Sequence, residues 1–256
     1  MRIETIGHLK CRIIDRLSED TNPKFVVVLC HGYGASGSDL VPIGDELLDL
    51  FPRLSGSVQF VFPEAPLTLD HLGLPGGRAW WPIDIVKLQL AVATGRFREM
   101  RNDRPDGLLP ARQSLQETIS VLCERTGLEL SRMIVGGFSQ GAMLSTETAM
   151  QLDRNLAALV VMSGTLLNEP EWRERAPRHS GLRVLQSHGT DDPLLPFEAA
   201  EELRDLLTKA GASVEFIPFP GGHQIPFEVF ERFGELLQTL ADEADGSGSS
   251  TSRGED

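Results

Sequence analysis

The stretch Met133-Ile134-Val135-Gly136-Gly137-Phe138-Ser139-Gln140-Gly141 decides the fold of this chain. An apolar run ends in the pattern G-x-S-x-G, and a helix-forming segment follows it. The pattern predicts a sharp turn from strand to helix that pushes the serine hydroxyl out of a sheet, where it can attack a carbonyl carbon. The glycines two residues before and two after the serine let strand and helix pass closely without Cβ clashes. Ser139 is therefore the candidate nucleophile.

Around this stretch, apolar runs rich in β-branched residues alternate with helical patterns. Strands are predicted over residues 10–16, 25–30, 58–62, 132–136, 157–162, 183–186 and 214–218, and helices over 39–51, 109–126, 140–152, 197–210 and 226–240, with Asp39 as a cap of the first helix. The run 25–29 is apolar at every position, which is typical of parallel strands covered on both faces. The alternation predicts an α/β fold, with a mostly parallel central sheet and helices on both sides.

The expected organisation is one domain over residues 1–243, followed by an acidic, Ser/Gly-rich disordered tail over 244–256. Within the domain, residues 73–110 form a long irregular segment with several turn signals. A connection of this length usually has a function, often as a lid or a substrate-binding loop.

Charge and composition exclude several classes of function. The 256 residues carry a net charge of −13, which argues against nucleic acid as a partner and disfavours anionic membrane surfaces. The sequence has no stretch suited to stable membrane insertion and its N-terminus lacks the layout of a signal peptide, so a cytoplasmic location is expected. Three cysteines without a spacing motif argue against a disulfide framework or a metal site. Cys30 as a nucleophile is an alternative, but a small buried core residue explains it better.

A serine nucleophile needs a base and an acid, and two loops after late strands supply candidates. One reads Ser187-His188-Gly189-Thr190-Asp191-Asp192-Pro193, and the other reads Gly221-Gly222-His223. In open α/β sheets the catalytic groups gather beyond the carboxyl ends of the strands. The chain order serine, aspartate, histidine is the one that hydrolases of this topology use. His223 is expected to take the proton of Ser139, and an aspartate to hold the imidazole in one tautomer.

Each of these assignments has an alternative. His223 could be a hydrogen-bonding loop histidine, and His188 could be the base, although its place at a strand end better suits support of the acid loop. Asp191 and Asp192 both precede the histidine. Pro193 restricts the backbone of Asp192 to extended conformations, which favours Asp192 as the fixed carboxylate and Asp191 as a solvated residue.

Two further segments supply groups around the nucleophile. The amide of Gln140, in the first turn of the helix, and the amide of Tyr33, in the turn His31-Gly32-Tyr33-Gly34, are the candidate oxyanion-hole donors. The alternative for the glycine turn is that it only connects strand and helix tightly. Arg78, Trp80 and Trp81 are the candidate substrate-binding residues, and the tryptophans either line an acyl pocket or anchor the loop to the core.

With these motifs assembled in order, the chain resembles the phospholipase/carboxylesterase family of α/β-hydrolases, which includes the acyl-protein thioesterases. The resemblance runs from about Phe25 to Leu240, and G-F-S-Q-G with H-G-x-x-D-P-x-x-P is its specific part. It implies an α/β-hydrolase fold, a triad of Ser139, Asp192 and His223, and an oxyanion hole of the Tyr33 and Gln140 amides. Two departures bear on substrate choice: the usual H-G-L-G-D opening is H-G-Y-G-A here, and the loop 91–108 is longer than in compact members.

The expected function is that of a serine hydrolase without a cofactor or metal, which cleaves carboxylic esters or thioesters through an acyl-enzyme. A carboxylesterase acting on a small-molecule ester or acyl substrate is the main interpretation, with lysophospholipase and acyl-protein thioesterase as alternatives. From another class, a catalytically silent hydrolase fold would act as a binding module. Members of the family often pair as dimers, which makes a homodimer an expectation from the resemblance, although the sequence shows no decisive interface.

Overall fold

An eight-stranded sheet runs through the computed structural model, which describes residues 1–18 and 21–248. The strand order is β1-β2-β4-β3-β7-β8-β9-β10. The strands are β1 (Arg2–Ile6), β2 (Leu9–Ile14), β3 (Phe25–Cys30), β4 (Val58–Pro63), β7 (Met133–Phe138), β8 (Ala158–Met162), β9 (Arg183–Gly189) and β10 (Ser213–Phe219). From β4 to β10 all neighbours are parallel, and β1 and β2 add an antiparallel edge. The short strands β5 (Leu67–Thr68) and β6 (Arg78–Ala79) form a separate hairpin.

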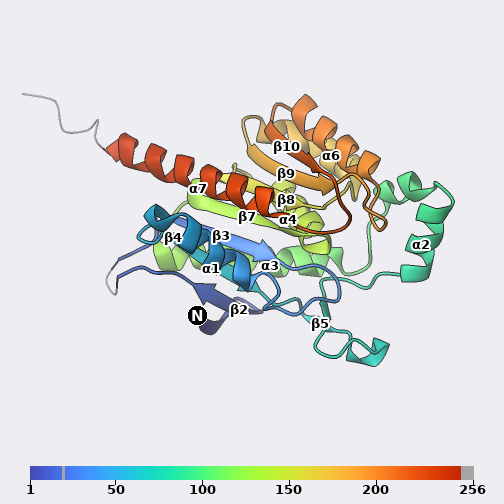
Figure 1. Cartoon of the computed structure of the whole chain (residues 1–256), viewed down its shortest axis with the longest axis horizontal. Helices are drawn as coiled ribbons and strands as arrows, with labels where there is room; N and C mark the ends of the chain where they lie inside the picture. The colour runs from blue at the N-terminus through green and yellow to red at the C-terminus, as the bar shows by residue number, and fades with distance from the viewer. Residues whose placement is uncertain (19–20, 249–256) are drawn as a thin grey trace, which may run out of the picture.

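Helices cover both faces of this sheet (Figure 1). On one face lie α1 (Val41–Leu50) and α7 (Phe227–Gly248); on the other lie α3 (Leu108–Thr126), α4 (Gln140–Gln151), α5 (Glu169–Arg175) and α6 (Phe197–Lys209). Helix α2 (Ile85–Ala93) stands apart from both layers (Figure 1). Single 3₁₀ turns at Pro52–Leu54, Asp70–Leu72, Phe97–Asn102, Leu130–Arg132 and Ala176–His179 complete the described elements.

The continuous apolar runs feed two separate cores. In β3, the side chains of Val26 and Val28 enter the core under α3 and α4, whereas Val27 and Leu29 enter the core under α1 and α7. All four are at most 1% exposed. Burial of each such side chain stabilises the fold by about 1.5–3 kcal/mol, which is why these strands have no polar face.

The structure confirms the predicted parallel sheet and corrects several details. Helix α1 begins at Val41 with Leu40 as its N-cap and no side-chain cap, so the expected capping by Asp39 is wrong. The segment 73–110 is not irregular throughout, since it contains β6, α2 and a 3₁₀ turn. Strand β1 was not predicted, because its alternation is short and its outward residues face solvent.

The C-terminal helix is longer than the sequence predicts. Helix α7 continues through Gly248, so residues 244–248 do not belong to a disordered tail. Ala244 packs against the core under α1 and α7, and Asp245 accepts a 2.5 Å hydrogen bond from Lys24, so tertiary contacts extend the helix beyond its apolar pattern. The rest of the expected tail, residues 249–256, lies outside the described residues.

Candidate active site

Ser139 occupies a strained turn between β7 and α4. Its φ is +55° and its ψ is −117°, a conformation that non-glycine residues rarely adopt. A Cβ atom on Gly137 or on Gly141 would collide with the carbonyl oxygen of Cys30 on the neighbouring strand. The two glycines therefore let the turn form against β3, and the turn carries Ser139 out of the sheet, as the G-x-S-x-G pattern predicts.

Asp192 and His223 lie at the ends of neighbouring strands. Because β9 and β10 are parallel and paired, the loops that follow them leave the sheet side by side. Backbone bonds tie the loops together: Thr190 N–H donates to Phe219 O, and Asp191 N–H donates to Gly221 O, each at 2.9 Å. The Nδ1 atom of His223 then lies 2.7 Å from Oδ2 of Asp192.

The carboxylate of Asp192 is buried and fully engaged. Its side chain is 0% exposed, and its Oδ1 accepts hydrogen bonds from the amides of Leu194 (2.9 Å) and Leu195 (3.0 Å). Burial favours the neutral acid, but the hydrogen bond from His223 and the two amides outweigh it and hold the pKa of Asp192 below its usual value. Asp191, by contrast, is exposed and accepts a bond from the hydroxyl of Thr190.

Ser139 and His223 line the same cavity, which has a volume of about 810 Å³. The His223 ring packs on the ring of Phe138, with ring centroids 4.7 Å apart. Because Nδ1 of His223 is bonded to Asp192, Nε2 is the nitrogen left for a proton from the serine. The sequence-predicted nucleophile, acid and base are thus brought together at one end of the sheet.

Gln140 follows the nucleophile and connects it to the tryptophan segment. It is the first residue of α4, where the helix leaves its amide without an intrahelical acceptor. Its buried side chain accepts a 2.9 Å bond from the amide of Trp80 and donates a 2.8 Å bond to the carbonyl of Trp81. Tyr33, the other candidate oxyanion donor, also lines the cavity.

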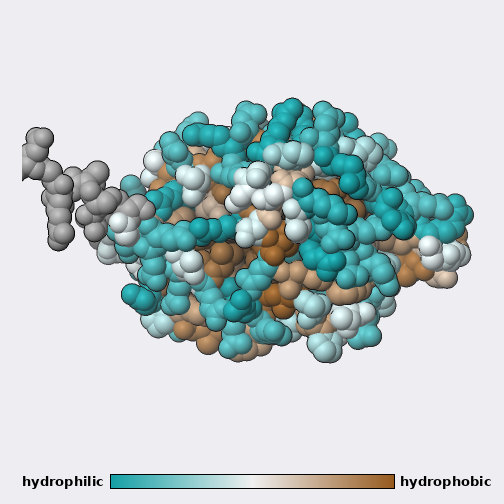
Figure 2. All heavy atoms as spheres, turned by 90° about the horizontal axis from the view of Figure 1, so that it is seen from above, coloured by the Kyte–Doolittle hydropathy of each residue, from teal (hydrophilic) through white to brown (hydrophobic). Residues whose placement is uncertain are grey.

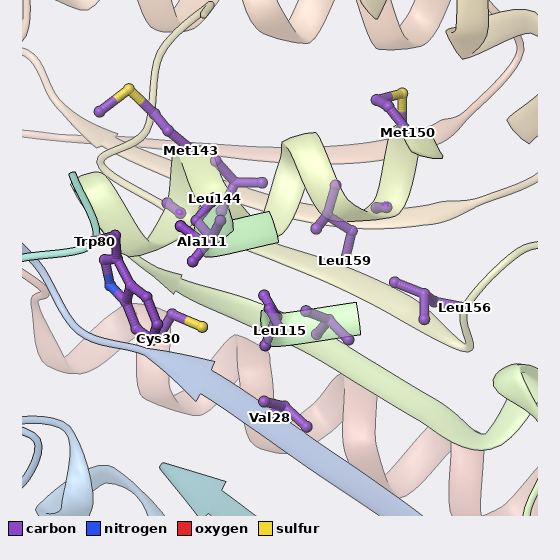
Figure 3. Packing of buried hydrophobic residues seen from close by; sticks show 14 of the residues in the cluster. Val28, Cys30, Trp80, Ala111, Leu115, Met143, Leu144, Met150, Leu156 and Leu159 are labelled. Carbon is purple, nitrogen blue, oxygen red and sulfur yellow. The ribbon is translucent and has the colours of Figure 1, made fainter. Parts of the chain in front are cut away.

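The two tryptophans have different places. Both side chains are buried in the same core cluster, but Trp81 also lines the cavity and Trp80 does not. Figure 3 shows Trp80 within this core. The indole N–H of Trp80 donates to the carbonyl of His31 at 2.9 Å. One ring is therefore placed for substrate contact and the other anchors the segment. Burial raises the pKa of the Cys30 thiol, which makes this residue a poor nucleophile.

Arg78 does not lie among the cavity-lining residues. Its guanidinium forms an ion pair of 3.2 Å with Glu64, which also pairs with Arg12 at 2.9 Å. Its backbone joins the glycine turn: Gly34 N–H donates to Arg78 O at 2.8 Å, and Arg78 N–H donates to Ala35 O at 3.0 Å. The structure therefore places Arg78 where it supports the turn that carries Tyr33.

Much of the cavity wall comes from residues 82–106, which we call the lid segment. It contributes the apolar residues Ile83, Ile85, Leu88, Val92, Phe97 and Met100, and the body contributes Met143, Leu166, Leu167 and Leu195. Sequence reasoning named none of these residues individually. The spacing of Leu88 and Val92, one helical turn apart, was a usable signal that one face of α2 looks inward.

Ion pairs fasten the far end of the lid segment to the body. Arg101 pairs with Glu169 at 2.6 Å and with Glu202 at 2.8 Å, and Lys87 pairs with Asp103 at 3.0 Å within the segment. In the described part of the chain, no group of three or more His, Cys, Asp or Glu residues is placed to hold a metal ion. No helix in the same residues is long and apolar enough to cross a bilayer.

Comparisons with known proteins agree with this geometry. The chain is 28% identical over 188 residues to acyl-protein thioesterase 1 of Cryptococcus neoformans var. neoformans serotype D, covering 72% of each protein. It is 26% identical over 219 residues to acyl-protein thioesterase 1 of Neurospora crassa, covering 82% of this chain and 84% of the relative. The crystal structure of esterase PE8 superposes with a TM-score of 0.75 at 28% identity, over 91% of this chain and 99% of that one.

A carboxylesterase from Mesorhizobium loti has the same fold, with a TM-score of 0.68 at 17% identity over 93% of this chain and 98% of that one. The sequence profile of the phospholipase/carboxylesterase family matches residues 15–241, and thus the parallel part of the sheet and its helices, but not β1 and β2. The turn at Ser139, the fold and this match agree. The chain therefore belongs to the phospholipase/carboxylesterase family of α/β-hydrolases, enzymes that hydrolyse ester and thioester bonds.

Proposed function

We propose that this hydrolase uses Ser139 as nucleophile, His223 as base and Asp192 as the orienting acid, and that it acts as a carboxylesterase on substrates with an apolar acyl group. The observation that carries the proposal is the 2.7 Å contact of His223 with a buried carboxylate, beside a strained serine that lines the same cavity. The three groups come from distant parts of the chain and share no structural task that would otherwise bring them together.

The chemistry follows from this arrangement. Oγ of Ser139 attacks the substrate carbonyl carbon while Nε2 of His223 takes the hydroxyl proton, and the carbonyl oxygen becomes an oxyanion. The amides of Tyr33 and Gln140 stabilise that charge. The intermediate collapses as His223 returns the proton to the leaving alcohol or thiol, which leaves an acyl-enzyme. Water, deprotonated by His223, then attacks the acyl carbon; as this second intermediate collapses, His223 returns the proton to Oγ of Ser139, and the acid and the free enzyme are released.

The cavity supports an apolar acyl group. The lid segment and the body line it mainly with aliphatic, aromatic and methionine side chains. Among these is Trp81, whose carbonyl accepts the hydrogen bond from Gln140. A cavity of about 810 Å³ has the size of a site for an extended ligand. The curated relatives named acyl-protein thioesterase make a thioester the second candidate substrate, and the same residues would cleave it.

The location and assembly of the enzyme belong to the same proposal. A cytoplasmic enzyme is supported by Cys11, Cys30 and Cys123, all of which are free thiols. A homodimer is an expectation from the family resemblance, and sedimentation velocity of the purified protein decides it.

The test is a series of p-nitrophenyl esters from acetyl to palmitoyl, with Ser139→Ala as the blank. We expect turnover by the wild type and essentially none by the variant, with a rate maximum at octanoyl or longer. A maximum at acetyl or butyryl would indicate a shallow site and contradict the acyl-group proposal. Equal rates for wild type and folded Ser139→Ala would end the assignment of the nucleophile. An S-acylated peptide and a lysophospholipid, assayed beside the best ester, separate thioesterase and phospholipase activity from carboxylesterase activity.

A further inference from the structure

A second histidine lies beneath the proposed triad. His188 is in β9, four residues before Asp192, and its side chain is 0% exposed. Its Nε2 atom is 2.8 Å from the carbonyl oxygen of Leu195 and 3.4 Å from Oδ2 of Asp192. His188 therefore touches the same carboxylate oxygen as His223, from the core side of the acid loop.

The environment determines the tautomer of His188. A carbonyl oxygen can only accept a hydrogen bond, so Nε2 of His188 carries the hydrogen and donates it to Leu195. Its Nδ1 atom is buried and has no hydrogen-bond partner among the described residues. Burial lowers the pKa of His188 below its ordinary value, an effect that the carbonyl of Leu195 and the charge of Asp192 only partly oppose. The ring is a neutral donor that exposes only Nε2–H to the acid loop.

From this geometry we infer that His188 is a positioning residue for the catalytic carboxylate; the inference rests on the triad proposed above. The Nε2–H group lies between Leu195 O and Asp192 Oδ2, while the amide of Leu195 donates back to Oδ1 of the same carboxylate. The loop after β9 that carries Asp192 is thus held together by contacts among His188, Asp192 and Leu195. His188 keeps the carboxylate turned toward His223 and reduces the negative charge that Oδ2 presents to it.

This arrangement makes a prediction about the proton affinity of His223. Near His223 lie Asp192 and His188 from the β9 side, while Ser139 from the β7–α4 turn lines the same cavity, as do the charged residues Asp39, Asp84, Lys87, Asp103, Arg104 and Asp106. Phe138 and, against His188, Phe197 are apolar neighbours. Without the N–H group of His188, the negative charge on Oδ2 of Asp192 is less reduced. Asp192 then attracts the protonated form of His223 more strongly. The acid limb of the pH–activity profile is then expected to move to higher pH.

The test compares two side chains of similar length. His188→Gln keeps an N–H donor near the position of Nε2, and His188→Met fills the space without a donor. For His188→Met we expect kcat on a p-nitrophenyl ester to fall about 10-fold with KM unchanged, because the donor to Leu195 O and the N–H dipole beside Oδ2 of Asp192 are both lost. The acid limb of the plot of kcat/KM against pH should move to higher pH. In His188→Gln, both kcat and the position of the acid limb should return to near their wild-type values.

His179→Met is the matched control, because His179 is also buried and its Nε2–H donates to a backbone carbonyl, that of Met150, away from the cavity. It should leave the acid limb unmoved. Equal behaviour of His188→Met and His188→Gln, or an unmoved acid limb in folded His188→Met, would overturn the inference and leave a packing role only. These results are distinct from failure of the proposed function, which Ser139→Ala reports independently.

If His188→Met does not fold, the wild-type protein still decides. Nitrogen-15 NMR of histidine-labelled protein, with the His188 signals identified by their loss in His188→Gln, reports tautomer and charge directly. We expect a neutral ring with the hydrogen on Nε2 throughout the range in which activity rises. A ring protonated on both nitrogens in that range, or a hydrogen on Nδ1, would contradict the inference.

Discussion

The proposed catalytic residues Ser139, Gln140, Asp192 and His223, which we call the catalytic floor, and the lid segment are built in opposite ways. Ser139, Asp192 and His223 stand on the ends of three strands, and each is held by a turn, a pair of amides or a neighbouring ring. In α2, the helix of the lid segment, no residue is buried. Val86 and Leu90 on its outer side are 75% and 62% exposed, and Figure 2 shows hydrophobic residues at the end of the molecule where α2 lies.

The difference separates the reaction from the choice of substrate. The floor can be rigid because the chemistry needs groups held within a fraction of an ångström. The lid segment forms the cavity wall with little burial of its own and is fastened by Arg101 to Glu169 and Glu202. Changes in the floor should therefore affect all substrates alike, whereas changes in the lid segment should affect substrates according to their acyl chains.

The largest effect is expected from the acid. Asp192→Asn removes the charge that stabilises protonated His223 and favours the wrong tautomer, so kcat should fall by about 10³- to 10⁴-fold for every ester. Asp191→Asn is the matched control: its side chain is exposed and contacts only Thr190 in the described structure, and activity should be unchanged. Steady-state kinetics of both purified variants decide which aspartate acts, and a larger loss in Asp191→Asn would reverse the assignment.

A smaller and more selective effect is expected in the lid segment. Leu88 faces the cavity, and Leu90 on the same helix faces solvent. Leu88→Trp should reduce the kcat/KM ratio of palmitoyl to acetyl ester by about 10-fold, because the ring takes space that the chain needs. Leu90→Trp, with the same change in size, should leave that ratio alone. If both variants change the ratio equally, α2 does not form the wall of the acyl site.

The smallest effect concerns the stability of the fold, and the histidines that cause it all lie outside the lid segment. Burial lowers the pKa of His31, His179 and His188 below the ordinary value. Their unfolded forms take up protons below about pH 6.5, while the folded forms resist protonation. The stabilisation is thus present above that pH and is lost as the pH falls toward the folded pKa values. Urea unfolding should give a lower free energy at about pH 5.5 than at about pH 7.5. A free energy of unfolding that is higher at about pH 5.5 than at about pH 7.5 would mean that these rings are protonated in the fold.

Sequence reasoning succeeded where local pattern and fold agree. The limits of β3 were predicted correctly and those of β8 to within one residue, because apolar runs flanked by turns leave few alternatives. The proposed triad of Ser139, Asp192 and His223 could be placed from the sequence for the same reason: each follows such a strand, and parallel strands bring their ends together.

What the sequence missed depends on contacts between distant segments. Arg78 was expected to bind substrate, but the carboxylate of Glu64, distant in the sequence from the nucleophile, holds it elsewhere. Helix α2 escaped prediction because Ile85 and Val86, which are β-branched, disfavour a helix, and the cap from Asp84 is a single weak signal. Residues 244–248 are helical because Lys24 and the core lie beside them.

Gln140 sets a limit on how far this enzyme can be recombined. Its amide belongs to the catalytic floor, while its side chain closes a bidentate bridge to the backbone of Trp80 and Trp81. A chimera that exchanges residues 85–106 with those of a relative should keep its turnover and acquire a new chain-length preference. A junction placed before Trp80 would take Trp80 and Trp81 from the relative and disturb their hydrogen bonds with Gln140. The hybrid would then lose activity even with the three proposed catalytic side chains intact. The boundary for engineering substrate choice therefore falls just after Trp81.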